Sequence, residues 1–288
     1  METPTTSERP WTALERLARG AELILIVAPY IKVDTLRRVL ALVSAQALLT
    51  CVTRWQRADI VAGVSDVACR TLVAERGGRF LLNQRLHAKY YRLGDAVLVG
   101  SANLTAAGMG YGSSPNVEIL SEPGSRFDPG AFERELLKNA REVSDVEFER
   151  WNALEQVPAA ATAVAKPDEP NEWRPMAREP EHVWLAYRGA TAAVVSGDER
   201  LRAARDLAAL RLPPGLDRSG FDVIVGAELL SSAAIADVLR TDGLPDEVAW
   251  TQLAEKWSTT RSEAQRFRET AWNWIVTVIG DTPPSPEA

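Results

Sequence analysis

Histidine and cysteine are scarce in this 288-residue chain, which has only His87, His182, Cys51 and Cys69. A Ser-His-Asp triad or a multi-histidine metal site would therefore depend on one of two histidines. The cysteines lack the spacing of a zinc site, and two are too few for a disulfide framework. Cys51 lies in the apolar run LLTCV, which predicts a buried side chain.

Long apolar runs are also missing. No run approaches the roughly 20 residues that a membrane-spanning helix needs. The first residues, METPTTSERPW, lack the apolar core of a secretory signal. We therefore expect a cytoplasmic protein with no membrane partner. Apolar residues make up 46% and charged residues 25% of the chain, which excludes disordered, collagen-like and coiled-coil proteins.

The charge is distributed unevenly along the chain. The formal net charge is -6, which argues against a surface that coats nucleic acid as a whole. Residues 51–92 nevertheless hold eight basic and three acidic residues, a net charge of +5, so the remainder carries -11. This pattern indicates a local anion-binding face on an acidic protein.

Short apolar runs alternate with helical patterns in the first half of the chain. This alternation predicts an α/β fold with helices on both faces of a mixed sheet. We expect helices at residues 13–20 and 33–43 and in the second part of 58–78. Strands are expected at residues 22–30, 45–55, 79–83, 87–93, 96–100 and 116–120.

The composition predicts two domains. One or two amphipathic helices within residues 127–157 close a first domain, 1–157. A Pro/Ala-rich linker is expected at 158–181. The C-terminal region, 182–288, is predicted to be α/β or helical, with a role in dimerisation, partner binding or DNA binding.

Within that region we expect short strands at 183–187 and 191–195 and a helix at 199–210. An apolar run at 221–230 follows, and then a helical C-terminus. Residues 250–272 allow a helix-turn-helix interpretation, but their acidic residues favour an amphipathic helical pair that packs on the protein.

The stretch LHAKYYRLGDAVLVGSANLT at residues 86–105 holds the residues most indicative of chemistry. Strand alternation places His87 and Lys89 on one face. One turn and one strand later comes Gly-Ser-Ala-Asn, and a helix is predicted to start at Leu104. Two paired strands would bring His87, Lys89, Ser101 and Asn103 into one pocket.

Such a set of side chains suits attack on a phosphate. A neutral His87 imidazole is the nucleophile and forms a phosphohistidine. Lys89 and Asn103 neutralise charge on the phosphate oxygens. Ser101 and the amides of the predicted helix start add anion affinity. This scheme needs neither a metal nor a cofactor.

This stretch resembles the phospholipase D superfamily, whose signature is H-x-K, then Asp after four residues, then G-S-x-N. His87, Lys89, Gly100, Ser101 and Asn103 match it. The resemblance covers roughly residues 20–122, including the two upstream strands and the segment NVEIL.

The resemblance implies three further roles. Glu118 would orient His87 from the NVEIL segment. Arg54, which follows a predicted strand, would contact the substrate phosphate, and the alternative is a surface arginine packed on Trp55. Asp95 would be the signature aspartate, although five residues separate it from Lys89 instead of four. A cap of the turn between the strands is the alternative for Asp95.

Only one such motif is present, since His182 has no lysine two residues later. The superfamily uses two motifs, one histidine attacking and the other protonating the leaving group. The resemblance therefore implies either a homodimer that shares one site across a twofold axis or an inactive chain.

The function implied is a metal-independent nuclease that acts as a homodimer, with DNA preferred over RNA. Relatives of this kind belong to bacterial defence or restriction systems, which adds defence-system proteins as possible partners. Two alternatives stay open. One is a catalytically degenerate subunit that docks to a partner enzyme, and the other is a phospholipase that hydrolyses phospholipids.

Overall fold

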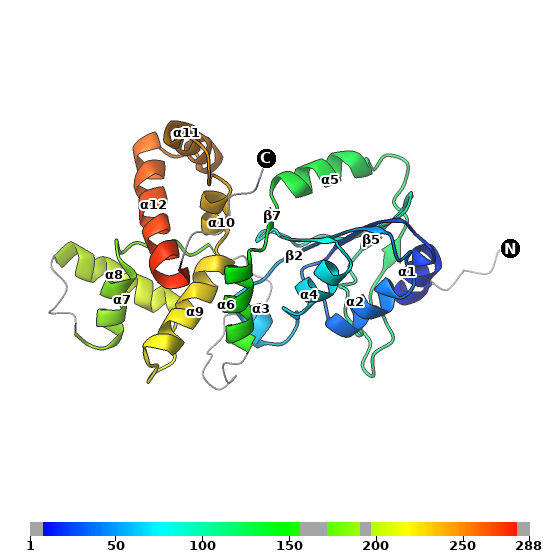
Figure 1. The fold of residues 1–288 in the computed structure, drawn as a ribbon, viewed down its shortest axis with the longest axis horizontal. Coiled ribbons are helices and arrows are strands. Elements are labelled where there is room, and N and C mark those ends of the chain that lie inside the picture. The colour runs from blue at the N-terminus through cyan, green and yellow to red at the C-terminus, as the bar shows by residue number, and fades with distance from the viewer. Residues whose placement is uncertain (1–7, 156–171, 191–196, 281–288) are drawn as a thin grey trace. The chain divides into compact units, whose positions relative to one another are not determined.

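A computed structural model describes residues 8–155, 172–190 and 197–280 (Figure 1). The chain forms two compact units. We call residues 8–55 and 63–142 the sheet unit. The helical unit comprises residues 56–62 together with the described residues from 143 onwards. The division falls after Glu142, whereas the sequence suggested a boundary at 157, and the helical unit also takes residues 56–62.

The sheet unit contains one seven-stranded mixed sheet with the strand order β6-β5-β4-β1-β2-β3-β7. Strands β1, β2 and β3 run parallel, and the other four run antiparallel to their neighbours. The predicted α/β class is confirmed at this level. The strands are β1 (Leu23–Val27), β2 (Leu48–Thr53), β3 (Arg79–Leu82), β4 (Lys89–Leu93), β5 (Ala96–Gly100), β6 (Leu120–Ser121) and β7 (Arg141–Glu142).

Helices cover both faces of this sheet. Figure 1 shows α5 (Pro129–Lys138) on one face, with α1 (Pro10–Ala18), α2 (Val33–Leu40) and α4 (Cys69–Glu75) on the other. Strand alternation explains the two layers, because successive side chains point to opposite faces. Val27 and Tyr90 pack toward Leu136 of α5. Their neighbours along the strands, Ile26 and Tyr91, therefore point to the opposite face, and both are fully buried.

Asp66 joins two segments of the sheet unit. It lies before α4 in the sequence, but its side chain serves the start of α2. Its Oδ2 accepts the Val33 backbone N–H at 2.8 Å, and its Oδ1 pairs with Lys32. A carboxylate at this end is favoured by the exposed N–H groups of the first turn. Lys32 is thus fixed by Asp66.

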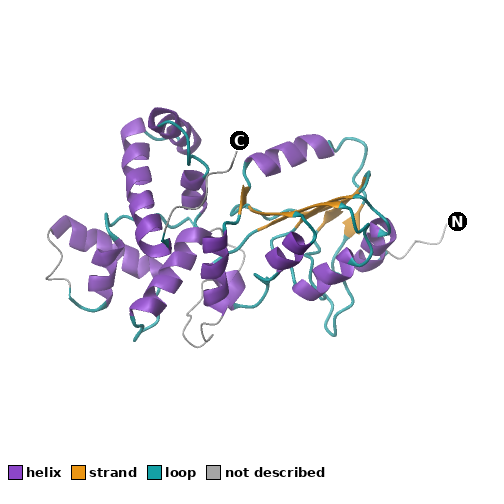
Figure 2. Cartoon of the chain, in the orientation of Figure 1, coloured by secondary structure: helices purple, strands orange, loops and turns teal. Residues whose placement is uncertain are grey.

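The helical unit holds no strand within its described residues (Figure 2). Its pairs α7–α8 and α11–α12 pack closely, as do α3, α6 and α9. Its helices are α3 (Arg57–Val61), α6 (Asp145–Glu155), α7 (Pro180–Tyr187), α8 (Gly197–Leu210), α9 (Arg218–Ser231), α10 (Ala233–Leu239), α11 (Asp246–Trp257), α12 (Arg261–Trp274) and the π-helical turn η3 (Ile275–Ile279).

The expected strand at 183–187 was wrong. These residues form most of α7, which begins at Pro180, a residue suited to the first helical turn. Trp184 and Tyr187 lie on one helix face, and both rings pack on Phe221 of α9. The expected strand at 191–195 lies outside the described residues. The helix expected at 199–210 is confirmed as α8.

The pair α11–α12 packs as expected for an amphipathic pair. Trp257 packs edge-on against Phe267, and its indole N–H donates to Asp237 at 2.8 Å. Ser258 between the helices adopts the left-handed conformation, with φ at 51°. Helix α11 therefore ends at a serine, although glycine is the residue that most often adopts this left-handed conformation.

Asp206 of α8 anchors the part of the predicted linker that the structure describes. Its carboxylate accepts the Ala177 N–H at 2.7 Å, the Met176 N–H at 2.9 Å and the Trp173 indole N–H at 3.2 Å. Asp206 is only 1% exposed. Burial raises its pKa to about 6, although these hydrogen bonds act in the opposite direction.

This anchor predicts a pH-dependent stability. Between the ordinary pKa of 3.8 and about 6, the folded protein holds a proton on Asp206 that the unfolded chain releases. The free energy of unfolding contributed by this group therefore falls as pH rises through that window, by at most about 3 kcal/mol. Asp206→Asn should lack this slope in urea unfolding measured at pH 4, 5, 6 and 7.

The matched control is Asp198→Asn, an exposed aspartate in the first turn of the same helix. We expect this control to keep the wild-type slope. An Asp206→Asn protein whose unfolding free energy follows the wild-type pH dependence would contradict the assignment.

Candidate active site

The predicted phosphate-binding residues gather at one end of the sheet. Lys89 begins β4 and lies opposite Gly100, the last residue of β5. Because β4 is antiparallel to β1, this place is also next to the end of β1, where Val27 pairs with Tyr90. Ligands of open α/β sheets bind at the carboxyl ends of the parallel strands.

His87 lies just before β4, which starts two residues later than predicted. Its ring is exposed. The Lys89 Nζ atom lies 3.3 Å from His87 Nδ1 and donates to the His87 carbonyl at 2.9 Å. The two side chains of the H-x-K pair therefore share one face, as the alternation predicted.

Gly100 and Ser101 bind the segment that precedes β6. A Cβ atom on Gly100 would lie only 1.9 Å from the Ile119 carbonyl oxygen, so no other residue fits without moving the backbone. Ser101 donates its N–H to that oxygen at 2.9 Å, and its Oγ accepts the Ile119 N–H at 3.1 Å. Ser101 is exposed beside Lys89 and holds the edge of the sheet in place. The strand expected at 116–120 is shorter than predicted, since β6 begins at Leu120.

Asn103 is held by the segment that follows β1. Its Oδ1 accepts the Tyr30 N–H at 3.3 Å, and the Leu104 N–H donates to the Tyr30 carbonyl at 3.1 Å. Because a backbone N–H must face the amide oxygen, the Nδ2 donors of Asn103 point the other way. Asn103 thus keeps two N–H groups for a ligand.

The helix predicted to start at Leu104 was wrong. Leu104 forms a bridge to Ile31, and a series of turns follows in which Thr105 Oγ1 accepts the Gly108 N–H at 3.0 Å. A Cβ atom on Gly108 would lie 2.6 Å from the Asn103 carbonyl. The tight turn therefore replaces the helix N-terminus that was expected to add anion affinity.

Arg54 fits neither of the two roles considered from the sequence. It is 1% exposed, so it is not a surface arginine, and it cannot reach a phosphate directly in this arrangement. Its Nη1 donates to the Leu86 carbonyl at 3.4 Å, and its Nη2 donates to the Tyr30 hydroxyl at 3.2 Å. Arg54 lies behind the predicted phosphate-binding residues.

Asp95 is separated from the other residues of the motif. It lies in the turn between β4 and β5, at the opposite end of the hairpin from Lys89 and Gly100. Strands of this length span roughly 13 Å between those ends. Asp95 is therefore withdrawn from the candidate site, and its position in the turn agrees with the capping alternative.

Glu118 lies at the same end of the sheet as His87, on the segment bound to Ser101. Its Oε1 accepts a hydrogen bond from Asn116 Nδ2 at 3.1 Å. No hydrogen bond joins Glu118 to His87 in the described part of the chain. The orienting role implied by the resemblance is therefore not visible in this arrangement.

Tyr30 and Tyr91 belong to the site but were not singled out in the sequence. The Tyr91 hydroxyl donates to the Ala102 carbonyl at 2.7 Å and so fixes the backbone between Ser101 and Asn103. Burial raises the Tyr91 pKa, with a smaller contribution from the Glu118 carboxylate. Two signals in the sequence could have pointed to them. Tyr30 stands at the end of an apolar run, and Tyr91 follows Lys89 by two residues, which places both side chains on one face of β4.

The second histidine, His182, lies within a group of hydrogen-bonded side chains in the helical unit. His182 of α7 lies in the helical unit with its Nδ1 3.2 Å from Glu199 Oε2. Glu199 also accepts the Arg178 backbone N–H and pairs with Arg202. His182 thus belongs to a hydrogen-bonded group that joins α7, α8 and the segment before them.

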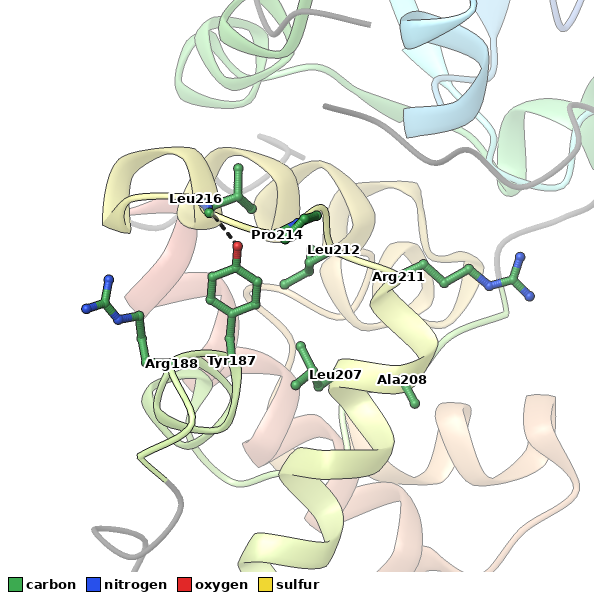
Figure 3. A pocket seen from close by; sticks show the side chains of 9 residues that line it. Tyr187, Arg188, Leu207, Ala208, Arg211, Leu212, Pro214 and Leu216 are labelled. Carbon is green, nitrogen blue, oxygen red and sulfur yellow. Dashed lines mark hydrogen bonds between the residues drawn. The ribbon is translucent and has the colours of Figure 1, made fainter. Parts of the chain in front are cut away.

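A cavity of about 660 Å³ in the helical unit contains none of the predicted site residues (Figure 3). Its apolar wall comes mainly from the end of α8 and the loop that follows. The Tyr187 hydroxyl accepts the Leu216 N–H at 2.7 Å and donates to the Pro213 carbonyl at 2.6 Å. Arg188 and Arg211 stand at its two sides with guanidinium groups directed outward.

No protein-family model fits the chain, and no curated protein matches it. Within residues 8–155, 172–190 and 197–280, no cluster of three or more His, Cys, Asp or Glu side chains could hold a metal ion. None of the helices described there is long and apolar enough to cross a membrane.

Proposed function

We propose that the chain is a phosphodiesterase of the phospholipase D superfamily that cleaves DNA through a covalent phosphohistidine, without a metal. The observation that carries this proposal is the convergence of His87, Lys89 and Asn103 at one end of the sheet. These three side chains offer a nucleophile, a cation and an oriented pair of amide donors.

The reaction starts when His87 Nε2 attacks phosphorus and the bond to the leaving oxygen breaks. The nearby Lys89 ammonium favours a ring with its proton on Nε2, because Nδ1 accepts from Nζ. A phosphate that draws Lys89 away from Nδ1 frees the ring to hold its proton there instead. Substrate binding thus prepares the nucleophile, and Lys89 and Asn103 then stabilise the charged oxygens. Water completes the cycle by hydrolysing the phosphohistidine.

The leaving oxygen needs a proton, and a second histidine supplies it in this scheme. His87 is the only histidine in the sequence of the sheet unit, and His182 is engaged with Glu199. A second copy of the chain would provide its own His87 across a twofold axis. The His87 of one chain would then attack phosphorus, while the His87 of the other chain would protonate the leaving oxygen and afterwards take a proton from the water that hydrolyses the phosphohistidine.

Two exposed apolar residues support this second copy. Val117 is fully exposed and Ile119 is 57% exposed, and they flank Glu118 on the segment bound to Ser101. Exposed apolar residues beside a site favour a protein contact when they form a continuous surface. We propose this segment as part of the contact between two copies.

DNA is the proposed substrate, because the charge pattern favours a nucleic acid over a lipid and the resemblance to restriction-type relatives favours DNA over RNA. Residues 51–92 carry a net charge of +5 in a chain of net charge -6. Arg54 and Arg57 are buried and Arg92 pairs with Glu133, so the other basic residues of this stretch supply the attraction. A role in bacterial defence or restriction, with partner proteins of such a system, follows from the resemblance and is part of the proposal.

Two observations favour other functions. Asp95 lies away from the site, and Glu118 forms no hydrogen bond with His87 among the described residues, which favours a catalytically degenerate subunit that docks to a partner. Val117 and Ile119 also give the site an apolar rim, which favours a phospholipase. Both alternatives are outcomes of the experiment below.

The test compares wild type with His87→Ala on plasmid, single-stranded DNA, RNA and phospholipid vesicles in excess EDTA. We expect wild type to cleave DNA and His87→Ala to lose more than about 100-fold in rate, because the nucleophile is gone. His182→Ala is the matched control and should keep the wild-type rate.

Equal rates for wild type and His87→Ala would contradict the nuclease. Hydrolysis confined to vesicles would establish the phospholipase. A wild-type protein inactive on every substrate would favour the degenerate subunit.

The proposed contact segment gives a separate prediction. Val117→Glu places a charge in the interface, so the mass from light scattering should fall from two chains toward one. DNA cleavage should fall with it, because each site would lose its second His87. The control is Leu48→Glu, which charges another exposed apolar residue at the opposite end of the sheet. A Val117→Glu protein that stays dimeric would contradict this interface.

A further inference from the structure

We infer that Arg54 and Tyr30 act as a positioning pair, in which one buried guanidinium holds the His87 segment and the Asn103 segment in register. This inference rests on the proposed function, because it assigns residues to the same site. Arg54 is 1% exposed and so offers no surface to a substrate phosphate. The role of the two residues is to fix the backbone from which the reacting side chains project.

The first contact acts on the segment before His87. The chain leaves β3 through a turn in which Asn83 donates its N–H to Thr53 at 2.9 Å and accepts the Leu86 N–H at 3.0 Å. Arg54 Nη1 donates to the Leu86 carbonyl, which belongs to the peptide unit of His87. The position of the nucleophile therefore depends on a side chain from the end of β2.

The second contact acts on Asn103 through Tyr30. Arg54 Nη2 donates to the Tyr30 hydroxyl, and the guanidinium carbon lies 5.6 Å from the centre of the Tyr30 ring. The Tyr30 backbone N–H holds Asn103 Oδ1, and its carbonyl accepts the Leu104 N–H. A shift of Tyr30 would thus turn the amide that offers its N–H groups to the phosphate.

Only arginine can make both contacts at once. Its planar guanidinium presents several N–H donors in fixed directions, whereas the lysine ammonium is a single point on a flexible chain. Lysine at position 54 could reach the Leu86 carbonyl or the Tyr30 hydroxyl but not both in their present positions. The relative placement of His87 and Asn103 should then loosen.

Loosening of this kind changes kcat more than KM. The charge of Lys89 still binds a phosphate, so affinity persists, while a misplacement of about 1 Å can cost about 100-fold in rate. We therefore expect Arg54→Lys to lower kcat about 100-fold with KM within about twofold of wild type. Tyr30→Phe, which removes only the hydroxyl, should lower kcat about 10-fold, as expected for one lost hydrogen bond.

The positioning pair also predicts that the effects of Arg54→Lys and Tyr30→Phe on kcat are not additive. Because the Tyr30 hydroxyl acts through Arg54, the double variant should be no slower than Arg54→Lys alone. The control is Arg37→Lys, an exposed residue of α2 paired with Asp34, which should leave both constants unchanged. All variants are compared in EDTA with the DNA substrate that wild type cleaves best.

A second readout does not depend on cleavage. The chain has only two histidines, so the imidazole NMR signals of His87 and His182 can be assigned with His182→Gln. Arg54→Lys and Tyr30→Phe should shift the His87 signals and leave those of His182 in place. A purely structural role would lower stability without moving either His87 signals or kcat.

The outcomes separate the two proposals. If wild type cleaves nothing but both variants move the His87 signals, the proposed function fails and the positioning pair stands. Additive kcat losses, a rise in KM with kcat unchanged, or unaltered His87 signals in Tyr30→Phe would overturn the positioning pair. Tyr30→Phe keeps the test valid if Arg54→Lys fails to fold.

Discussion

The antiparallel pairing of β4 with β1 is the constraint on which the candidate site depends. Val27 at the end of β1 lies opposite Tyr90 near the start of β4, so His87 and Lys89 reach the carboxyl ends of the parallel strands. The hairpin then returns β5 to the same place. Every residue proposed to act on the phosphate lies within a few residues of this junction, on segments that separate strands deliver.

Backbone hydrogen bonds hold these segments to one another where regular strands have ended. Tyr30 binds the segment at Asn103 and Leu104, Thr53 binds Asn83, and Ser101 binds Ile119. Loops at the end of a rigid sheet are a common place for binding groups, because the sheet fixes their origins while the loops set their directions. Two buried side chains add further hydrogen bonds to these segments: Arg54 donates to the Leu86 carbonyl, and Tyr91 donates to the Ala102 carbonyl.

The sequence allowed the sheet and the convergence of His87, Lys89 and Asn103 to be predicted, because apolar runs, the Gly94 turn and motif spacing are local signals. The burial of Arg54 could not be predicted, since its partners lie 24 and 32 residues away along the chain. A helix was expected to start at Leu104, but the next residue, Thr105, accepts the Gly108 N–H within a turn. Residues 183–187 resembled a strand, yet packing on Phe221 favours a helix. Long-range packing decided the cases of Arg54 and residues 183–187, whereas a local hydrogen bond decided that of Thr105.

The central claim is a covalent bond between His87 and the substrate phosphate. The most direct measurement is a single-turnover reaction with end-labelled DNA in EDTA, quenched in alkali and followed by peptide mapping. A phosphohistidine survives alkali and is released by acid, so the account predicts an acid-labile label on the peptide that contains His87. Cleavage by wild type in EDTA without any label on that peptide would contradict the account.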